Sequence, residues 1–254
     1  MQRSSVSSIL RSNQAYCDLL CDKQTLTWGI AFHSRAWSAL PQANQFREVV
    51  ISDDQQIPEA YDAAEAFFAD EGLTCRRWAP AEGQPDDALG RYLEGLGYQR
   101  RETTTLALGA WPDVTKPRSD FRILPARPMR AAYRATFDSG TDNAAIEADA
   151  AVERLDDGRL EAIVVMDGDQ PIGRATLFEV GDIGRLVDVY VVPEARGRGA
   201  AKAMVAHLLA VARRLAVGIV CVQVDSADEA AMAFFQGRGF VCDGTICEFD
   251  APEP

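Results

Sequence analysis

Between residues 185 and 249 the sequence alternates between strand-like and helix-like segments, and this order restricts the folds open to the chain. The run "RLVDVYVV" is rich in β-branched residues and stops at Pro193, as a strand does. From Ala201 to Leu215 apolar residues recur at helical spacing along one face, and Gly218 is placed to end that helix. Next come "IVCVQV", "DEAAMAFFQG", "FVCD" and "TICEF". Strands and helices in this order predict a mixed sheet largely covered by helices.

The stretch before this segment adds two helices and two strands. "PMRAAYRATF" and "NAAIEADAAVERL" are helix-like, whereas "EAIVVMDGDQPIGRATLFEV" indicates two strands that reverse at residues 167–169. We therefore predict an α/β (α+β) fold with a mixed, mostly antiparallel central sheet flanked by helices.

The N-terminal part repeats the same ending in weaker form. "REVVIS", "PEAYDAAEAFFADEG", "TCRRWA" and "DALGRYLEGLG" follow the order strand, helix, strand, helix, and "GLGYQRRETTTLAL" runs parallel to "GRGFVCDGTICEF". A duplicated domain explains this repeat. We predict domains at 1–110 and 120–254, joined by a Pro-containing linker at 111–119.

Charge and composition exclude several classes of function. The chain has 26 Lys+Arg against 38 Asp+Glu, a formal net charge of −12, which disfavours nucleic acids and anionic membranes and weakly favours an amine-bearing partner. No window holds the roughly 18 apolar residues of a membrane helix, and the polar start does not match a secretory signal, so we expect a cytoplasmic protein. Cys17 and Cys21 would share one helix face, but no second Cys/His pair completes a metal site.

The connection "PEARGRGAA" carries the strongest functional signal. Gly197 and Gly199 let the main chain approach a bulky anion, Arg196 and Arg198 add phosphate-binding donors, and a helix N-terminus follows. Together they describe a pyrophosphate-binding loop, although a Gly-rich turn with solvated arginines fits the residues equally well. The spacing matches neither a Walker loop nor a dinucleotide fingerprint. The first copy has "SDDQQIPEA" here, so we expect no such site in it.

Two motifs resemble the GNAT family of acyl-CoA-dependent N-acetyltransferases. Residues 196–201 fit its R/Q-x-x-G-x-G/A loop, and "DSADEAAMAFFQGRGF" is similar to its N-x-x-A-x-x-x-Y-x-x-x-G-F segment. In that segment Asp228 takes the Asn position and Phe235 the Tyr position. The resemblance covers roughly residues 119–250, and the N-terminal copy then resembles a degenerate GNAT-like half.

The resemblance implies an N-acetyltransferase that binds acetyl-CoA between the strands at 186–192 and 219–224. An amine of a small molecule or peptide would attack the thioester directly, while a main-chain amide polarises its carbonyl. The cofactor-binding residues that the resemblance implies are Val189, Tyr190, Val191, Arg196, Gly197, Arg198, Gly199, Ala200, Ala201, Lys202, Asp228 and Phe235. A homodimer is left open.

The catalytic residues are less defined by the sequence. Asp188 is a candidate general base, although a charge on a strand end is also commonly just solvated. Phe235 has no proton for the departing CoA thiolate, which leaves three explanations: Tyr190 or a cysteine such as Cys242 protonates it, no dedicated acid is needed, or the domain binds CoA without turnover. A non-catalytic acyl-CoA-binding module is therefore the alternative to an enzyme, and a nucleotide-binding module is a third hypothesis.

Overall fold

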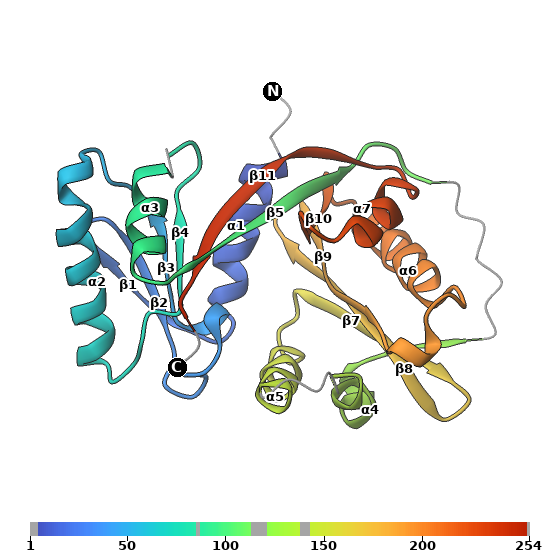
Figure 1. The fold of residues 1–254 in the computed structure, drawn as a ribbon. Coiled ribbons are helices and arrows are strands. Elements are labelled where there is room, and N and C mark those ends of the chain that lie inside the picture. The colour runs from blue at the N-terminus through green and yellow to red at the C-terminus, as the bar shows by residue number, and fades with distance from the viewer. Residues whose placement is uncertain (1–4, 85–86, 113–120, 138–142, 253–254) are drawn as a thin grey trace. The chain divides into compact units, whose positions relative to one another are not determined.

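The computed structural model describes residues 5–84, 87–112, 121–137 and 143–252. The chain divides into two compact units (Figure 1). Unit 1 comprises Met1–Ser12, Thr105–Val224 and Asp228–Gly244, and unit 2 comprises Asn13–Thr104, Asp225–Ala227 and Thr245–Pro254. Among the described residues, no helix is long and apolar enough to span a membrane.

The sheet of unit 1 is mixed and mostly antiparallel, as the sequence predicts. Its strand order is β11-β5-β10-β9-β8-β7-β6, with antiparallel pairing from β6 to β9 and parallel pairing of β9 with β10. The strands are β5 (Gln99–Leu108), β6 (Arg122–Pro125), β7 (Leu160–Asp167), β8 (Gln170–Val180), β9 (Ile183–Val191), β10 (Ile219–Asp225) and β11 (Phe240–Asp250). β5 and β11 also contribute residues to unit 2.

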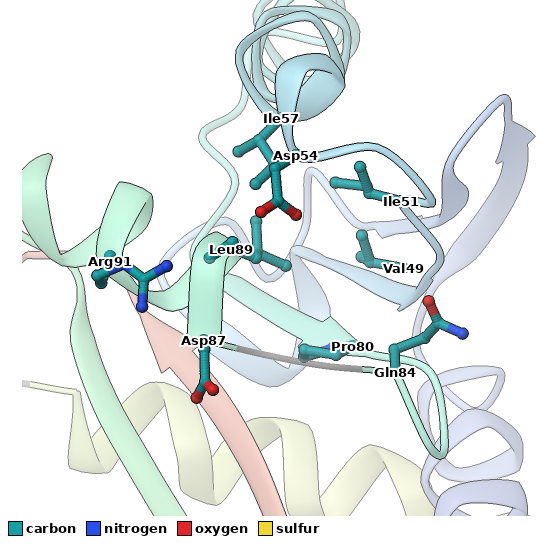
Figure 2. A pocket seen from close by; sticks show the side chains of 10 residues that line it. Val49, Ile51, Asp54, Ile57, Pro80, Gln84, Asp87, Leu89 and Arg91 are labelled. Atoms are coloured by element: carbon teal, nitrogen blue, oxygen red, sulfur yellow. The ribbon is translucent and has the colours of Figure 1, made fainter.

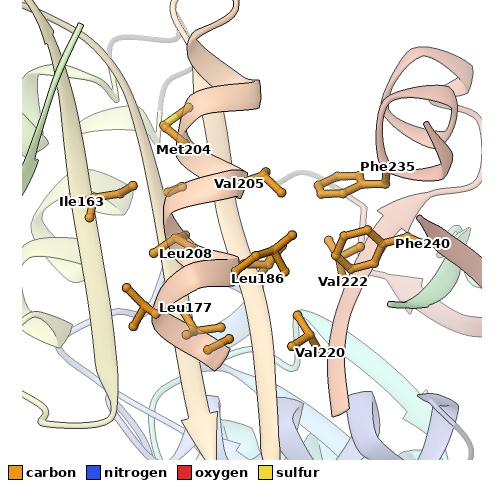
Figure 3. Packing of buried hydrophobic residues seen from close by; sticks show 14 of the residues in the cluster. Ile163, Leu177, Leu186, Met204, Val205, Leu208, Val220, Val222, Phe235 and Phe240 are labelled. Atoms are coloured by element: carbon orange, nitrogen blue, oxygen red, sulfur yellow. The ribbon is translucent and has the colours of Figure 1, made fainter. Parts of the chain in front are cut away.

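Helices cover both faces of this sheet (Figure 1). Helices α6 (Ala200–Arg214) and α7 (Glu229–Gln236) lie on one face, and α4 (Arg130–Ala135) and α5 (Ala144–Arg154) lie on the other. The predicted apolar stripe of α6 is buried: Met204 and Leu208 have no exposed surface and pack with strand residues such as Leu186 (Figure 3). Truncating a leucine in such a core costs about 2–5 kcal/mol.

The end of α6 differs from the prediction. The helix stops at Arg214, and Ala216 takes the left-handed conformation with φ 56°. Gly218 instead begins the approach to β10, where its amide donates to the carbonyl of Asp182 at 2.7 Å. The expectation that Gly218 ends the helix is therefore wrong, because the chain reverses two residues earlier, on an alanine.

Unit 2 repeats the order strand, helix, strand, helix, strand. It contains β1 (Asp22–Leu26), β2 (Gly29–His33), β3 (Gln45–Val49) and β4 (Arg77–Pro80), with α2 (Ile57–Asp70) and α3 (Asp87–Gly95) after β3 and β4. β3 and β4 are parallel, as β9 and β10 are in unit 1. Helix α1 (Ser5–Cys17) and the hairpin β1–β2 precede this order. Since α1 ends at Cys17, the expectation that Cys17 and Cys21 share a helix face is wrong.

The division into units differs from the predicted domains because the two copies exchange their last strands. β5 ends the first copy but neighbours β10, and β11 ends the second copy but pairs with β4. Residues 105–110 therefore fall in unit 1 and residues 245–254 in unit 2. Most of the predicted linker at 111–119 lies outside the described residues, so the linker remains a prediction.

Candidate functional site

The strands β9 and β10 separate halfway along their length. Their parallel pairing runs from Ile183–Ile219 to Leu186–Val222 and stops there, although β9 continues to Val191. Just beyond this point Asp188 has a φ of 53°, and the pairing of β9 with β8 shifts register. Such a bulge bends a strand away from its neighbour. The main chain of β9 from Asp188 to Val191 therefore borders an opening rather than a paired strand.

A cavity of about 580 Å³ lies at this opening, a size within the range of about 300–1,000 Å³ for small-molecule and cofactor sites. The end of β9, the connection to α6, the start of α6 and helix α7 line it. Eleven of the predicted cofactor-binding residues are among those that line it: Val189, Tyr190, Val191, Arg196, Gly197, Gly199, Ala200, Ala201, Lys202, Asp228 and Phe235. The structure therefore brings the two sequence motifs to one cavity.

The connection into α6 presents a row of main-chain N–H groups. Gly197 and Gly199 have φ values of 76° and 89°, which glycine adopts readily, and Gly199 is the residue that precedes the helix. Within the described residues, the amides of 197–202 have no intramolecular acceptor, and Ala203 is the first to donate back, to the carbonyl of Gly199 at 3.0 Å. Amides in this state at a helix N-terminus suit an anion such as a phosphate.

The three basic side chains of the connection have different surroundings. Arg196 lines the cavity while its Nε donates to the carbonyl of Val191 at 3.1 Å, which fixes the guanidinium beside the end of β9. Lys202 also lines the cavity and is exposed. Arg198 does not line it, because its Nη2 pairs with Asp167 Oδ2 at 2.8 Å. The structure thus separates Arg198 from the residues with which the sequence groups it, and its cofactor role stays a prediction.

Helix α7 closes the other side of the cavity. Asp228 caps it, since its Oδ1 accepts from the amide of Ala231 at 2.9 Å. Phe235 is 5% exposed and packs edge-on against Phe240, so an aromatic ring with no exchangeable proton occupies this position. Cys242 is exposed and is not among the residues that line the cavity, which leaves Tyr190 as the candidate acid nearest to it.

Arg238 is a cavity residue that the sequence analysis missed. Its guanidinium carbon lies 3.5 Å from the centre of the Phe234 ring, and both residues line the cavity. Burial lowers the pKa of Arg238. The sequence does carry a signal for it, because Arg238 stands within the matched segment, directly before Gly239 and Phe240.

A second group of polar residues lies around Tyr190 and comes from β8, β9 and α5. The Arg174 guanidinium lies 3.4 Å from the centre of the Phe137 ring and 4.6 Å from that of Tyr190, and its Nη1 donates to the carbonyl of Thr136 at 2.6 Å. Glu147 of α5 interacts electrostatically with Asp188 and Arg174. Partial burial and the charge of Asp188 raise the pKa of Glu147, and Arg174 opposes them.

Unit 2 has a smaller cavity at the matching place, of about 220 Å³ (Figure 2). Val49, Ile51 and Ile57 line it together with the carboxylates Asp54 and Asp87. Among the described residues of the whole chain, no three His, Cys, Asp or Glu side chains are grouped as a metal site.

Comparison with known proteins identifies the class. Residues 127–240 match the acetyltransferase (GNAT) family. A GCN5-related N-acetyltransferase from Kribbella flavida is similar over 100% of this chain and 97% of its own, with 15% sequence identity and a TM-score of 0.68. A functionally unknown conserved protein from Staphylococcus epidermidis is similar over 90% and 93% of the two chains, with 15% identity and a TM-score of 0.71.

The chain therefore contains an acetyltransferase domain of the GNAT family, and the GNAT-like fold extends over its whole length. Comparison of the sequence with curated proteins gave no significant match. At 15% identity the structural neighbours establish the fold and not the acceptor.

Proposed function

We propose that unit 1 is an N-acetyltransferase that moves an acetyl group from acetyl-CoA to a primary amine. The observation that carries this proposal is the row of amides at 197–202, which have no acceptor within the described chain and border the cavity beside Arg196 and Lys202. A diphosphate supplies the acceptors that these amides lack. The cavity then continues along the main chain of Val189 to Val191, where an extended pantetheine arm can pair as an added strand would.

In the proposed reaction, the neutral amine nitrogen attacks the thioester carbonyl carbon. A main-chain amide of β9 stabilises the oxyanion, the nitrogen loses its surplus proton to water, the C–S bond breaks, and the CoA thiolate leaves. Asp188 lies in the bulge beside the opening and takes the proton of the ammonium, directly or through water. With phenylalanine at 235, the thiolate leaves without a dedicated acid, because a thiol pKa of about 8.5 makes it a tolerable leaving group near neutrality.

The double variant Arg196→Ala/Gly199→Asp tests the proposal. It removes one guanidinium and places a carboxylate among the amides, so we expect the Kd for acetyl-CoA to rise at least tenfold, about 1.4 kcal/mol, by isothermal titration calorimetry. The matched control is Gln55→Ala/Gln56→Asp in unit 2, which should leave the Kd unchanged. An unaltered Kd in the unit 1 variant, with its circular dichroism spectrum retained, would contradict the proposed site.

Phe235 favours a second candidate, an acyl-CoA-binding module without catalysis. Its buried ring leaves the position of the usual proton donor without an exchangeable proton. Thiol release measured with acetyl-CoA and a broad panel of amines separates the two functions. Tight binding of acetyl-CoA without thiol release for any amine would support the module, whereas release with even one amine supports the transferase.

A further inference from the structure

Gly173 of β8 lies against the part of β9 that borders the cavity. It pairs with Val191 of β9, and the next residue, Arg174, pairs with Tyr190. Tyr190 and Val191 both line the cavity. Gly173 itself is buried, so its influence on the site acts through the strand that it touches.

The space beside Gly173 is too small for a side chain. A Cβ atom at this position would lie 2.7 Å from the carbonyl oxygen of Tyr190, 3.3 Å from Cε of Met204 on α6 and 3.4 Å from Cα of Val191. The first distance is shorter than non-bonded carbon and oxygen atoms allow. The oxygen belongs to the main chain and cannot turn aside as a side chain can, so β9 itself would have to move. Glycine within a strand commonly marks such a close approach of two backbones.

The carbonyl of Tyr190 shares a peptide unit with the N–H of Val191. In a trans peptide these two groups lie in one plane and point in opposite directions. Since the carbonyl oxygen lies against β8, the N–H of Val191 points away from β8, toward the side on which β9 leaves β10. The proposed function places the pantetheine arm on that side. A displacement of the Tyr190 carbonyl would therefore displace a donor of the site.

We propose that Gly173 is a positioning residue of the cofactor site. Because it has no side chain, the peptide between Tyr190 and Val191 can lie close enough to β8 to present its N–H to the pantetheine arm. This inference rests on the proposed function and adds to it a residue that does not touch the ligand. The diphosphate end should be independent of Gly173, since Gly173 approaches α6 only at the flexible end of the Met204 side chain, which can turn aside.

The test separates the two parts of acetyl-CoA. Gly173→Ala should raise the Kd for acetyl-CoA at least tenfold in calorimetric titrations. ADP carries a diphosphate without the pantetheine arm, so its Kd should stay within twofold when it is measured from the ¹H–¹⁵N shifts of residues 197–202. A general loss of structure would instead weaken the binding of both ligands, and that result would overturn the inference.

Gly184→Ala is the matched control. Gly184 is also buried, and a Cβ there would lie 3.1 Å from Leu177 Cδ1 and 3.2 Å from Val217 Cγ2, which are side-chain atoms. It lies in the part of β9 that still pairs with β10, opposite Val220. Both Kd values should therefore stay within twofold of those of the wild-type chain. An equal rise of the Kd for acetyl-CoA in the two variants would contradict the role of Gly173.

Should Gly173→Ala fail to fold, Gly173→Ala/Met204→Leu takes its place, because leucine lacks the Cε atom that lies next to the added methyl group. Its Kd for acetyl-CoA should still be at least tenfold higher than that of Met204→Leu alone. If the wild-type chain does not bind acetyl-CoA, the proposed function fails and this inference fails with it. If the wild-type chain binds and Gly173→Ala binds within twofold of it, the inference alone is overturned.

Discussion

In both units a residue with positive φ interrupts the strand before the first helix of the repeated order: Glu48 in β3 and Asp188 in β9. From that residue the chain reaches the helix at Ile57 in unit 2 and at Ala200 in unit 1, so the connection of unit 2 is three residues shorter. The same backbone irregularity therefore precedes two connections of different length, and their chemistry differs as well.

The amides of the two connections differ in whether they have hydrogen-bond acceptors within the protein. In unit 2 the side chain of Asp53 accepts from the amide of Gln55 at 2.9 Å, and its carbonyl accepts from Gln56. In unit 1 the amides of 197–202 have no acceptor among the described residues. Asp53 thus caps the short 3₁₀ helix Asp54–Gln56 that leads into α2, so the amides of Gln55 and Gln56 are not offered to a phosphate. The carboxylates of Asp53 and Asp54 would also repel one.

The strand pairs next to the two connections also differ in how far their main-chain pairing extends. β3 and β4 remain paired beyond the bulge, up to Val49–Pro80, and the amide of Ala81 donates to the carbonyl of Val49 at 3.0 Å. β9 and β10 stop pairing before the bulge, at Leu186–Val222. Pairing in unit 2 uses the main-chain groups that in unit 1 border the larger cavity. Main-chain groups that are paired within unit 2 are therefore left unpaired at the cavity of unit 1, where the proposed function places the acetyl donor.

The largest effect that we expect is on the stability of unit 2. In unit 2, Glu248 of β11 is 3% exposed and pairs with Arg47 of β3 at 2.9 Å and with Arg77 of β4 at 3.4 Å. Glu248→Ala would leave the buried guanidinium of Arg47 without its carboxylate and that of Arg77 with Asp250 alone, so the free energy of unfolding should fall by about 3–5 kcal/mol. Urea denaturation followed by tryptophan fluorescence measures it, since Trp28, Trp37 and Trp78 lie in unit 2.

Glu59→Ala, at an exposed position on α2, is the control and should change the free energy of unfolding by no more than about 0.5 kcal/mol. If Glu248→Ala lowered the free energy of unfolding by as little as this control, the buried ion pairs would not stabilise the strands of unit 2.

The same carboxylate predicts a pH dependence. Burial alone would raise the pKa of Glu248, but Arg77 and Arg47 lower it to about 2 from an ordinary value of 4.5. Its contribution to stability is therefore complete above pH 4.5 and is lost as the pH falls towards 2. We expect a loss of up to about 3 kcal/mol across that range, read from urea denaturation at successive pH values. Glu248→Gln should have a shallower slope, and equal slopes in both proteins would refute the assignment.

The cap of the short 3₁₀ helix Asp54–Gln56, which leads into α2, gives a smaller effect that separates stability from binding. Asp53→Ala removes the acceptor for Gln55 and should lower the free energy of unfolding by about 0.5–2 kcal/mol. The Kd for acetyl-CoA should not change. A higher Kd for acetyl-CoA in this variant would mean that the connection of unit 2 takes part in binding the ligand.

Two arginines within the connection of unit 1 provide the finest distinction. Arg196 lines the cavity, whereas Arg198 is paired with Asp167. Arg196→Ala should therefore weaken acetyl-CoA binding about fivefold, roughly 1 kcal/mol, and Arg198→Ala less than twofold. Equal effects in calorimetric titrations would mean that Arg198 leaves Asp167 when the ligand binds.

Much of unit 1 follows from local patterns in the sequence. The stripe from Ala201 to Leu215 predicts α6, and the two motifs predict the residues that meet at its cavity. The exchange of last strands was not predictable, because β5 and β11 have tails of similar length and either could pair with either partner. The electrostatic interaction of Glu147 with Asp188 was not predictable either, because the two residues lie far apart in the sequence and belong to different elements, α5 and β9.

The central claim, that the amides of 197–202 bind a diphosphate, can be tested most directly by amide chemical shifts. In ¹H–¹⁵N spectra we expect CoA to shift the resonances of residues 197–202 strongly, whereas pantetheine, which lacks the diphosphate, should shift them little. The resonances of Gln55 and Gln56 should respond to neither ligand. Saturation with CoA that leaves the amides of 197–202 unshifted would contradict it.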